Sequence, residues 1–288
     1  MFDRISSGFR AAGDCWGILR QDKKLLLFPL VSGICCIIVL LSFVVPMVVV
    51  RPQAIVAVFN QQNPRAGAAN LPWWFYALVF AFYFCNYFVI YFFNAALVHC
   101  ALLHFKGVPV TVGDGLQAAT RSLPHILAWS LVSATVGLIL KAIESHREGG
   151  RFISGLLGTA WSIVTYFVVP VLIVEKVDPF TAIKRSTQIL RNTWGEALGG
   201  RIGIGWALLP FWLIAIVLAV GGAFLCATVL PLGLALIALA VVCMITIGLV
   251  SSALGTILQS GLYLFATEGQ VPNGMDRDVL QHGFSAKA

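Results

Sequence analysis

Residues 25–50 read LLLFPLVSGICCIIVLLSFVVPMVVV, and this stretch carries no charged side chain. A helix that crosses the hydrocarbon layer of a bilayer needs about 20 consecutive apolar residues. The stretch exceeds that length and lacks an A-x-A cleavage site, so we predict a retained membrane span rather than a signal peptide. The whole chain is 59% hydrophobic and 11% charged, which is more apolar surface than one soluble core can bury. The sequence therefore predicts an integral membrane protein.

Five further apolar stretches follow the first along the chain. The six predicted spans cover roughly residues 25–50, 73–103, 123–143, 152–174, 202–230 and 232–266. Only Pro231 lies between the last two, which predicts a tight helical hairpin or a partly re-entrant pair. The predicted fold class is all-α, a polytopic membrane helix bundle with six transmembrane helices. We expect a single integral membrane domain over residues 1–270 and a short cytoplasmic tail over residues 271–288.

Lysines and arginines are distributed unevenly between the two sides of these spans. Fourteen lie in the termini and connectors of one side, and five lie on the other, namely Arg51, Arg65, Lys141, Arg147 and Arg151. Cytoplasmic connectors carry the excess of positive charge. We therefore predict a multi-pass protein of the cytoplasmic (inner) membrane with both termini in the cytoplasm.

A short amphipathic segment precedes the first, third and fifth predicted spans. In the third segment, Asp178 followed by Pro179 is a good helix start, because Asp accepts free N–H groups and Pro tolerates the first helical position. Its apolar stripe consists of Phe180, Ile183, Thr187, Leu190 and Trp194. We predict that the three segments are helices lying on the cytoplasmic surface.

The other two segments have related patterns. In the second, Thr111 and Asp114 have capping-box spacing, Pro124 predicts a kink into the third span, and the stripe consists of Val112, Leu116, Ala119 and Leu123. In the first, Asp3 is a candidate N-cap and the stripe consists of Ile5, Phe9, Ala12, Trp16 and Leu19. A shift of 67 positions pairs Leu116, Thr120 and Leu123 with Ile183, Thr187 and Leu190. We interpret this as a repeat of an interfacial helix and a two-span hairpin, with chance similarity as the alternative.

The segment VDPFTAIKRS, residues 177–186, ends a span and opens a basic amphipathic helix. It resembles a pattern in several uncharacterised prokaryotic membrane-protein families, including relatives of the glycerophosphodiester phosphodiesterase membrane domain. Residues 16–33, with Phe28-Pro29-Leu30, are similar to the opening of a six-span bacterial family with no assigned function. The resemblance implies a fold type and no catalytic residue, because the phosphodiesterase chemistry of that relative lies in a separate soluble domain.

Basic and aromatic residues of the predicted cytoplasmic side form a candidate lipid site. Lysine and arginine attract anionic headgroups by about 1 kcal/mol each near the surface, and the candidates are Arg10, Arg20, Lys23, Lys24, Lys184, Arg185 and Arg191. Tryptophans anchor helices at the membrane interface, and the candidates are Trp16, Trp73, Trp74 and Trp194. We therefore expect a non-enzymatic scaffold or lipid-interacting module. Its expected partners are anionic lipids, with a protein partner or a second copy of the chain left open.

A transporter or channel for a small neutral or lipid-like substrate is the alternative function. Charged residues, which ion-coupled transporters keep inside the membrane, are almost absent from the predicted spans. The deep polar groups are neutral, and the candidate intramembrane site consists of Asn86, Asn94, Ser252, Thr256 and Gln259. Hydrogen bonds between helices and close helix packing are the simpler explanation of these residues.

Motifs for catalysis, cofactors and metals are missing from the sequence. It has no G-x-S-x-G elbow, no H-E-x-x-H pair and no C-x-x-C pair. His99 and His104 have no acidic residue at a ligand spacing beside them. A nucleic-acid role would need a basic patch on a soluble domain, for which the chain has no room. We expect no catalytic residue, no cofactor, no metal site and no nucleic-acid partner.

Overall fold

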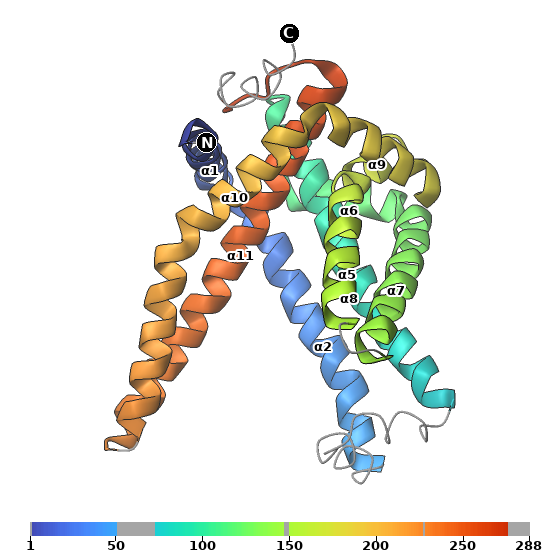
Figure 1. Ribbon diagram of the computed structural model, residues 1–288. Helices are drawn as coiled ribbons and strands as arrows, with labels where there is room; N and C mark the ends of the chain where they lie inside the picture. Colours follow the sequence, from blue (N-terminus) through green and yellow to red (C-terminus); the bar gives the residue numbers. More distant parts are fainter. Residues whose placement is uncertain (1, 51–72, 147–149, 227, 276–288) are drawn as a thin grey trace. The chain divides into compact units, whose positions relative to one another are not determined.

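The computed structural model describes residues 2–50, 73–146, 150–226 and 228–275, and every regular element within these ranges is a helix (Figure 1). The elements are α1 (Phe2–Gln21), the short 3₁₀ helix η1 (Lys23–Leu26), α2 (Leu27–Val50), α5 (Trp73–Phe105), α6 (Val112–Arg121), α7 (Leu123–His146), α8 (Gly150–Val164), α9 (Val168–Val174), α10 (Pro179–Cys226) and α11 (Leu230–Glu268). The predicted all-α fold class is confirmed.

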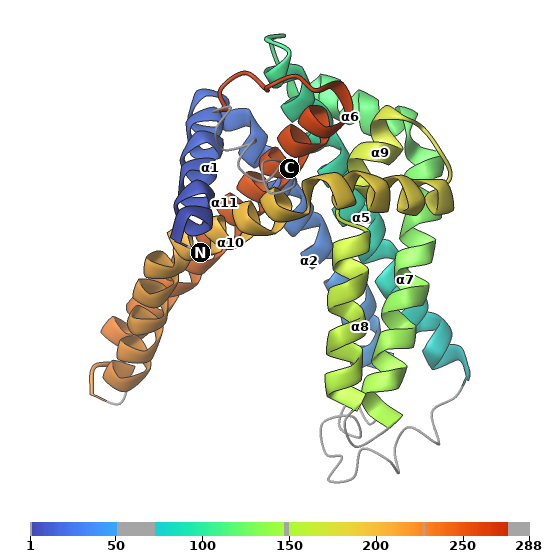
Figure 2. The same cartoon turned by 45° about the horizontal axis from the view of Figure 1, so that its top comes forward.

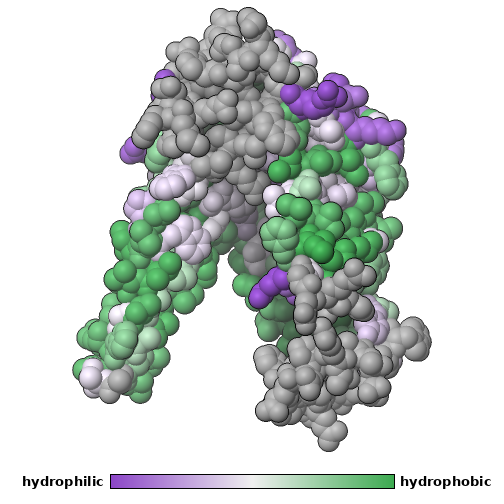
Figure 3. All heavy atoms as spheres, in the orientation of Figure 1, coloured by the Kyte–Doolittle hydropathy of each residue, from purple (hydrophilic) through white to green (hydrophobic). Residues whose placement is uncertain are grey.

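Six segments of the described residues are long and apolar enough to cross a membrane, namely Lys23–Val49, Trp74–Phe105, Leu123–Glu144, Gly150–Val174, Gly203–Cys226 and Leu230–Glu268. Their outward side chains are apolar, as at Ile37 and Ile38 of α2, which are 57% and 59% exposed. Figure 3 shows apolar side chains over the lower part of the α10–α11 hairpin on the face in view. Apolar surfaces of this extent on helices of this length are typical of segments that cross a membrane. The chain is a multi-pass membrane protein, as predicted.

The helices form two compact units. Unit 1 consists of Met1–Leu30, Ala96–Gly115 and Gln188–Ala288, and unit 2 consists of Val31–Ala95 and Leu116–Thr187. Both are assembled from segments that are far apart in the sequence, and α2, α5 and α10 each contribute residues to both. The units are therefore not domains that a linker separates along the chain.

In unit 1, α1 packs against α11. The buried residues of α1 include Ala11, Cys15 and Ile18, which follow one another by four and three positions and so share a face. Gly261 of α11 lies at another close approach, because a Cβ there would be 2.7 Å from the Met275 sulfur. Small residues on α1 and α11 thus keep the interior of unit 1 tight.

The α10–α11 hairpin of unit 1 also depends on glycine. A Cβ on Gly233 would lie 2.5 Å from the backbone nitrogen of Cys226 and 2.7 Å from the Gly222 carbonyl oxygen. Small residues let membrane helices approach backbone to backbone, and Figure 2 shows α10 and α11 running side by side.

The turn of this hairpin lies earlier than predicted. α10 ends at Cys226 and α11 begins at Leu230, so Pro231 is in the first turn of α11 and does not separate the spans. Proline is tolerated there because the first N–H groups of a helix have no intrahelical partner.

The length of α10 differs from the prediction of an interfacial helix and a separate span. Pro179–Cys226 is one helix of 48 residues, because the glycines between the two predicted elements cost only about 1 kcal/mol each relative to alanine and do not end the helix. Its length is about 72 Å at 1.5 Å per residue, more than twice the ~30 Å hydrocarbon layer. Only Gly203–Cys226 has the apolarity of a span, so the preceding turns extend beyond the hydrocarbon.

In unit 2, α7 and α8 pack along each other (Figure 1). Trp129 of α7 stacks on Trp161 of α8 with ring centroids 5.9 Å apart, and Tyr91 of α5 contacts Trp129 at the same centroid distance. Aromatic pairs at such distances contribute beyond the area that they bury. These rings form the centre of unit 2.

The predicted fourth span is interrupted, because residues 165–167 form a turn between α8 and α9. Pro170, at the start of α9, has no N–H and its ring clashes with a helical carbonyl four residues earlier. Ser186 of α10 closes the break: its hydroxyl donates to the Val164 carbonyl at 2.7 Å and accepts from the Phe167 N–H at 3.0 Å. A broken helix is tolerated in a membrane when neighbours satisfy the freed backbone groups in this way.

Three helix ends share one backbone conformation. α5, α9 and α11 are each followed closely by a residue of positive φ, namely Gly107 (71°), Lys176 (51°) and Gly269 (67°). A left-handed residue commonly ends a helix, and proline often follows because it cannot continue the helix. Here proline follows within three residues each time, at Pro109, Pro179 and Pro272.

The interpretation of an internal repeat gains support from these connectors. The shift of 67 positions also brings Thr111 and Asp114 onto Asp178 and Thr181, and in both pairs the threonine hydroxyl donates to the aspartate at 2.6 Å. Threonine and aspartate exchange positions, but the capping chemistry is the same.

Candidate lipid interface and intramembrane polar row

The N-terminus of α10 is capped as predicted. Asp178 Oδ2 accepts hydrogen bonds from the backbone N–H groups of Phe180 and Thr181 at 3.1 and 3.0 Å, in addition to the bond from the Thr181 hydroxyl to Oδ1. The Thr181 hydroxyl, followed by these backbone groups, holds the pKa of Asp178 below its ordinary value. An ionised carboxylate therefore fixes the start of the helix.

The first turns of α10 have one buried and one exposed face. Ala182 and Ser186 are buried, whereas Phe180 is 69% exposed. Lys184 and Arg191 are also exposed and follow Phe180 by four and eleven positions, which places the three on one helical face. Figure 3 shows hydrophilic residues gathered near the α9–α10 junction. The exposed face thus combines an aromatic ring with two cations.

α1 presents a similar face. Phe9 and Trp16 are 44% and 50% exposed, and Arg20 is exposed four positions after Trp16. Of the predicted stripe, Ala12 and Leu19 are buried, and the side chain of Ile5 lies outside the described part of the structure. The difference arises because apolar residues surround much of this helix, so that its periodicity alone does not decide which row faces the protein.

Cys15, which lies outside the predicted spans, is fully buried in unit 1. Desolvation raises the pKa of its thiol, with a smaller contribution from Asp14. A protonated, enclosed thiol is unreactive, so Cys15 is a packing residue.

The capping box of α6 is confirmed. The Thr111 hydroxyl and N–H donate to Asp114 Oδ2 at 2.6 and 3.2 Å, and the Asp114 N–H donates to Thr111 Oγ1 at 3.2 Å. The Thr111 hydroxyl is also the main reason that the pKa of Asp114 is lowered. The predicted kink is a break at Ser122, between α6 and α7, which leaves Pro124 in the first turn of α7.

Two of the seven predicted headgroup-binding cations already have protein partners. Arg185 Nε lies 3.1 Å from Glu175 Oε1, and Lys24 Nζ donates to the Val110 carbonyl at 3.4 Å. The other five are exposed, namely Arg10, Arg20, Lys23, Lys184 and Arg191. Their binding of lipid stays a prediction.

Two of the four predicted tryptophan anchors can be described. Trp16 is half exposed, and Trp74 is half-buried at the start of α5. The side chains of Trp73 and Trp194 lie outside the described part of the structure.

The predicted intramembrane polar residues belong to different units. In unit 2, Asn86 Nδ2 donates to the Phe82 carbonyl of its own helix at 3.0 Å. Asn94 is not without a partner either. In unit 1, Ser252 is exposed, Thr256 donates to the Ser252 carbonyl at 3.1 Å, and Gln259 has an interaction. Local bonds therefore account for Asn86 and Thr256.

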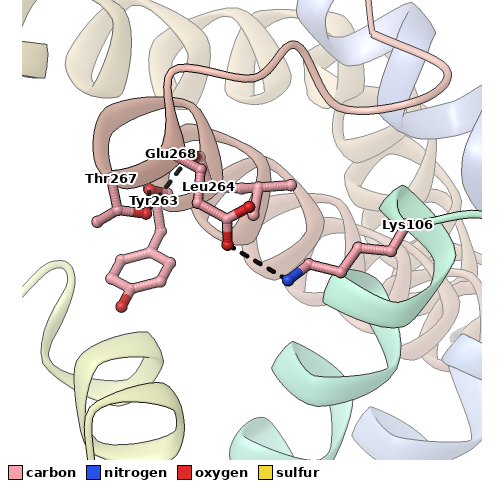
Figure 4. Close-up of polar contacts among 5 residues, drawn as sticks. All are labelled: Lys106, Tyr263, Leu264, Thr267 and Glu268. Carbon is pink, nitrogen blue, oxygen red and sulfur yellow. Dashed lines mark hydrogen bonds and ion pairs between the residues drawn. The ribbon is translucent and has the colours of Figure 1, made fainter.

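Two contacts of unit 1 were not predicted. His104 Nδ1 is hydrogen-bonded to Asp22 Oδ2, and Lys106 Nζ lies 3.3 Å from Glu268 Oε1 (Figure 4). The His104 side chain is only 15% exposed. The partners are 82 and 162 positions apart, so no spacing rule reveals them.

A row of unpartnered polar atoms on α7 was also missed. His125 Nδ1, Trp129 Nε1 and Ser133 Oγ are buried and have no hydrogen-bond partner among the described residues. Successive members are four positions apart, so the row follows one face of α7. The spacing of four was visible, but burial on this face was not.

Comparison with known proteins places the chain in a family. A family of unknown function (DUF6159) matches residues 74–273. The chain belongs to this family. That agrees with the prediction of an uncharacterised membrane-protein family, whereas the resemblance to the glycerophosphodiester phosphodiesterase membrane domain has no support from the comparison. No curated protein and no solved structure matches the chain.

Proposed function

We propose that this protein is a non-enzymatic lipid-interacting module of the cytoplasmic membrane, and that α1 and the start of α10 bind anionic headgroups on the cytoplasmic side. The observation that supports this most is the exposed face of α10, where Phe180 lies on the same side as Lys184 and Arg191. Apolar rings next to cations are typical of helices that lie in a membrane interface.

The same combination on α1 supports the proposal independently. Phe9 and Trp16 are large and exposed, and Arg20 is exposed four positions after Trp16. α1 precedes the first span, and the start of α10 precedes the fifth. If all six helices cross the bilayer, these two faces are on the same side, because four spans separate them. The concentration of cations at one surface then strengthens the attraction for anionic lipids.

Lipid retention tests the proposal. The full-length protein is placed in nanodiscs of phosphatidylglycerol and phosphatidylcholine, and native mass spectrometry measures the ratio of the two lipids retained. We expect phosphatidylglycerol to be enriched, and the double variant Lys184→Gln/Arg191→Gln to lose up to about 30-fold of this selectivity if each cation contributes ~1 kcal/mol.

Arg151→Gln is the matched control. Arg151 is 92% exposed and lies on the side that the charge distribution assigns to the exterior. Its replacement should leave the lipid ratio unchanged. Equal retention of the two lipids by the wild-type protein, or an equal loss in the control and the double variant, contradicts the proposal.

Orientation has a separate test. Tags on the two ends of the chain are exposed to protease from either side of inverted and right-side-out membrane vesicles. We expect both tags to be cleaved only from the cytoplasmic side. Cleavage from opposite sides would remove the common surface on which the proposal depends.

A further inference from the structure

The three unpartnered atoms on α7 have a distinct hydrogen-bonding character. Trp129 Nε1 can only donate, the Ser133 hydroxyl donates and accepts, and His125 Nδ1 does either according to its tautomer. Trp129 and Ser133 are 1% and 3% exposed. Buried polar groups in membrane proteins are normally paired, because no water is present in the hydrocarbon. Within the described residues no bond of normal geometry satisfies these three atoms, and the Tyr91 hydroxyl lies near Trp129 and Ser133.

Other hydroxyl groups of α7 bond to the carbonyl oxygen four residues earlier, so the helix itself does not prevent Ser133 from doing the same. Ser130 donates to the Ile126 carbonyl at 2.7 Å, and Thr135 donates to the Leu131 carbonyl at 2.9 Å. Both bonds join a residue to the one four positions earlier in α7. Ser133 lies between them on the same helix and makes no such bond, so its hydroxyl differs from the two that bond to their own backbone.

Aromatic rings surround the row. Trp129 contacts Trp161 at an interplanar angle of 14°, and Tyr91 contacts Trp129. The Tyr91 hydroxyl interacts with both Ser133 and Trp129, although neither contact has the geometry of a normal hydrogen bond. Tyr87 stacks on Tyr91 at a centroid distance of 5.9 Å. The polar atoms thus lie among flat π-surfaces from α5 and α8.

One end of the row is closed by close packing. Gly137 is four positions beyond Ser133, and a Cβ there would lie 3.1 Å from the Tyr87 hydroxyl oxygen. α5 and α7 therefore leave no room at that level. The unpartnered atoms lie on the other side of this contact, between Gly137 and Pro124.

Charge is absent around the row. Residues 73–98, 123–140 and 152–164, which include the neighbouring parts of α5, α7 and α8, contain no Asp, Glu, Lys or Arg. A charged ligand would have no counter-charge there, and burying an unpaired charge is prohibitive. The chemistry of the site thus favours an uncharged molecule with acceptor oxygens and a flat apolar body.

From this arrangement we infer that unit 2 contains an intramembrane binding site for a quinone-like lipid, whose carbonyl oxygens accept hydrogen bonds from Trp129 Nε1 and the Ser133 hydroxyl. The backbone positions of these two residues are about 6 Å apart along the α7 axis, at a rise of 1.5 Å per residue, which is comparable to the distance across a quinone ring. The rings of Tyr91 and Trp161 provide stacking surfaces. The donors are enclosed, so the proposal requires Tyr91 and Trp161 to move when the ligand enters.

Direct binding tests the inference. The full-length protein in phosphatidylcholine nanodiscs is titrated with tritiated decylubiquinone in a scintillation proximity assay. We expect saturable binding, and we expect Trp129→Phe and Ser133→Ala each to weaken it by about 2- to 10-fold, the range for the loss of one hydrogen bond. Ser130→Ala is the matched control and should bind like the wild type, because its hydroxyl already has a partner.

A competition experiment distinguishes binding of decylubiquinone at the site from its partition into the lipid of the nanodisc. Decylbenzene carries the same alkyl chain and a ring without oxygen, and it should not displace decylubiquinone. Absence of saturable binding, equal competition by decylbenzene, or unchanged affinity in Ser133→Ala would each overturn the inference. If Trp129→Phe fails to fold by circular dichroism, Ser133→Ala decides, since it removes one enclosed oxygen atom without changing the packing of a ring.

Discussion

Ser186 and Ser133 are both buried serines of unit 2, and they have opposite hydrogen-bond states. Ser186 joins α10 to the α8–α9 break by donating to Val164 and accepting from Phe167, whereas Ser133 on α7 has no partner among the described residues. The α9–α10 junction is thus a region where polar groups hold the fold together. In the middle of α7, buried polar atoms make no hydrogen bond of normal geometry with the described residues.

The largest effect is expected from Ser186→Ala. Removing the hydroxyl leaves the Val164 carbonyl and the Phe167 N–H unpaired in a buried helix break, which should lower the free energy of unfolding by about 2–4 kcal/mol. Unfolding by sodium dodecyl sulfate, followed by circular dichroism, measures the change. Ser162→Ala, which removes an exposed hydroxyl bonded to the Gly158 carbonyl, should change it far less. Equal losses in the two variants would show that the break does not depend on Ser186.

A smaller effect is expected from Arg185→Gln at the same junction. The ion pair with Glu175 is partly exposed, with 43% and 28% of the two side chains accessible. Such pairs contribute about 0.2–1 kcal/mol, so the loss of unfolding free energy should be within that range and should shrink in high salt. A loss as large as that of Ser186→Ala would mean that Arg185 has a further role in the junction.

The cap of α10 should respond locally to pH. The pKa of Asp178 is lowered from 3.8, so its stabilisation is fully present above about pH 4 and is lost as the pH falls through the lower folded value. Amide hydrogen exchange at Phe180 and Thr181, corrected for its intrinsic pH dependence, should accelerate over that acidic range. Asp178→Asn, which still accepts hydrogen bonds but does not titrate, should flatten the response. An unchanged pH profile in this variant would assign the effect to another group.

The smallest effect on stability is expected from Ser133→Ala. No bond is lost when this hydroxyl is removed, and a buried unpartnered group is replaced by an apolar one, so the free energy of unfolding should stay the same or rise slightly. The measurement is the same as for Ser186→Ala. A loss above about 1 kcal/mol, the contribution of a typical hydrogen bond, would show that Ser133 is paired in the folded protein and would remove the contrast between the two serines.

Local features of the sequence predicted much of this structure. The spans follow from apolar length, and the caps at Asp178 and Thr111 follow from side chains that reach only two or three residues along the chain. The predictions failed where the tendency of a residue to end a helix depends on what packs against it. Glycine did not end α10, whereas Pro170 together with Ser186 broke the fourth span.

The candidate sites divide in the same way. Lys184 and Arg191 were identifiable from the sequence as exposed cations, whereas Phe180 was assigned to the apolar stripe and lies instead on the exposed face with them. The contacts Asp22–His104 and Lys106–Glu268 were not identifiable, because the chain must fold before these partners meet. The α7 row had a visible spacing, but the sequence does not state that three of its polar atoms are enclosed.

By itself, the sequence determined that this protein lies in a membrane as long helices, since hydrophobic length and charge distribution act residue by residue along the chain. It also determined where α6 and α10 begin. Only the tertiary structure decided which polar atoms are partnered, because pairing depends on what a neighbouring helix brings to each buried group. For this reason Ser186 stabilises the fold, and Ser133, which looks equivalent in the sequence, is part of the candidate binding site.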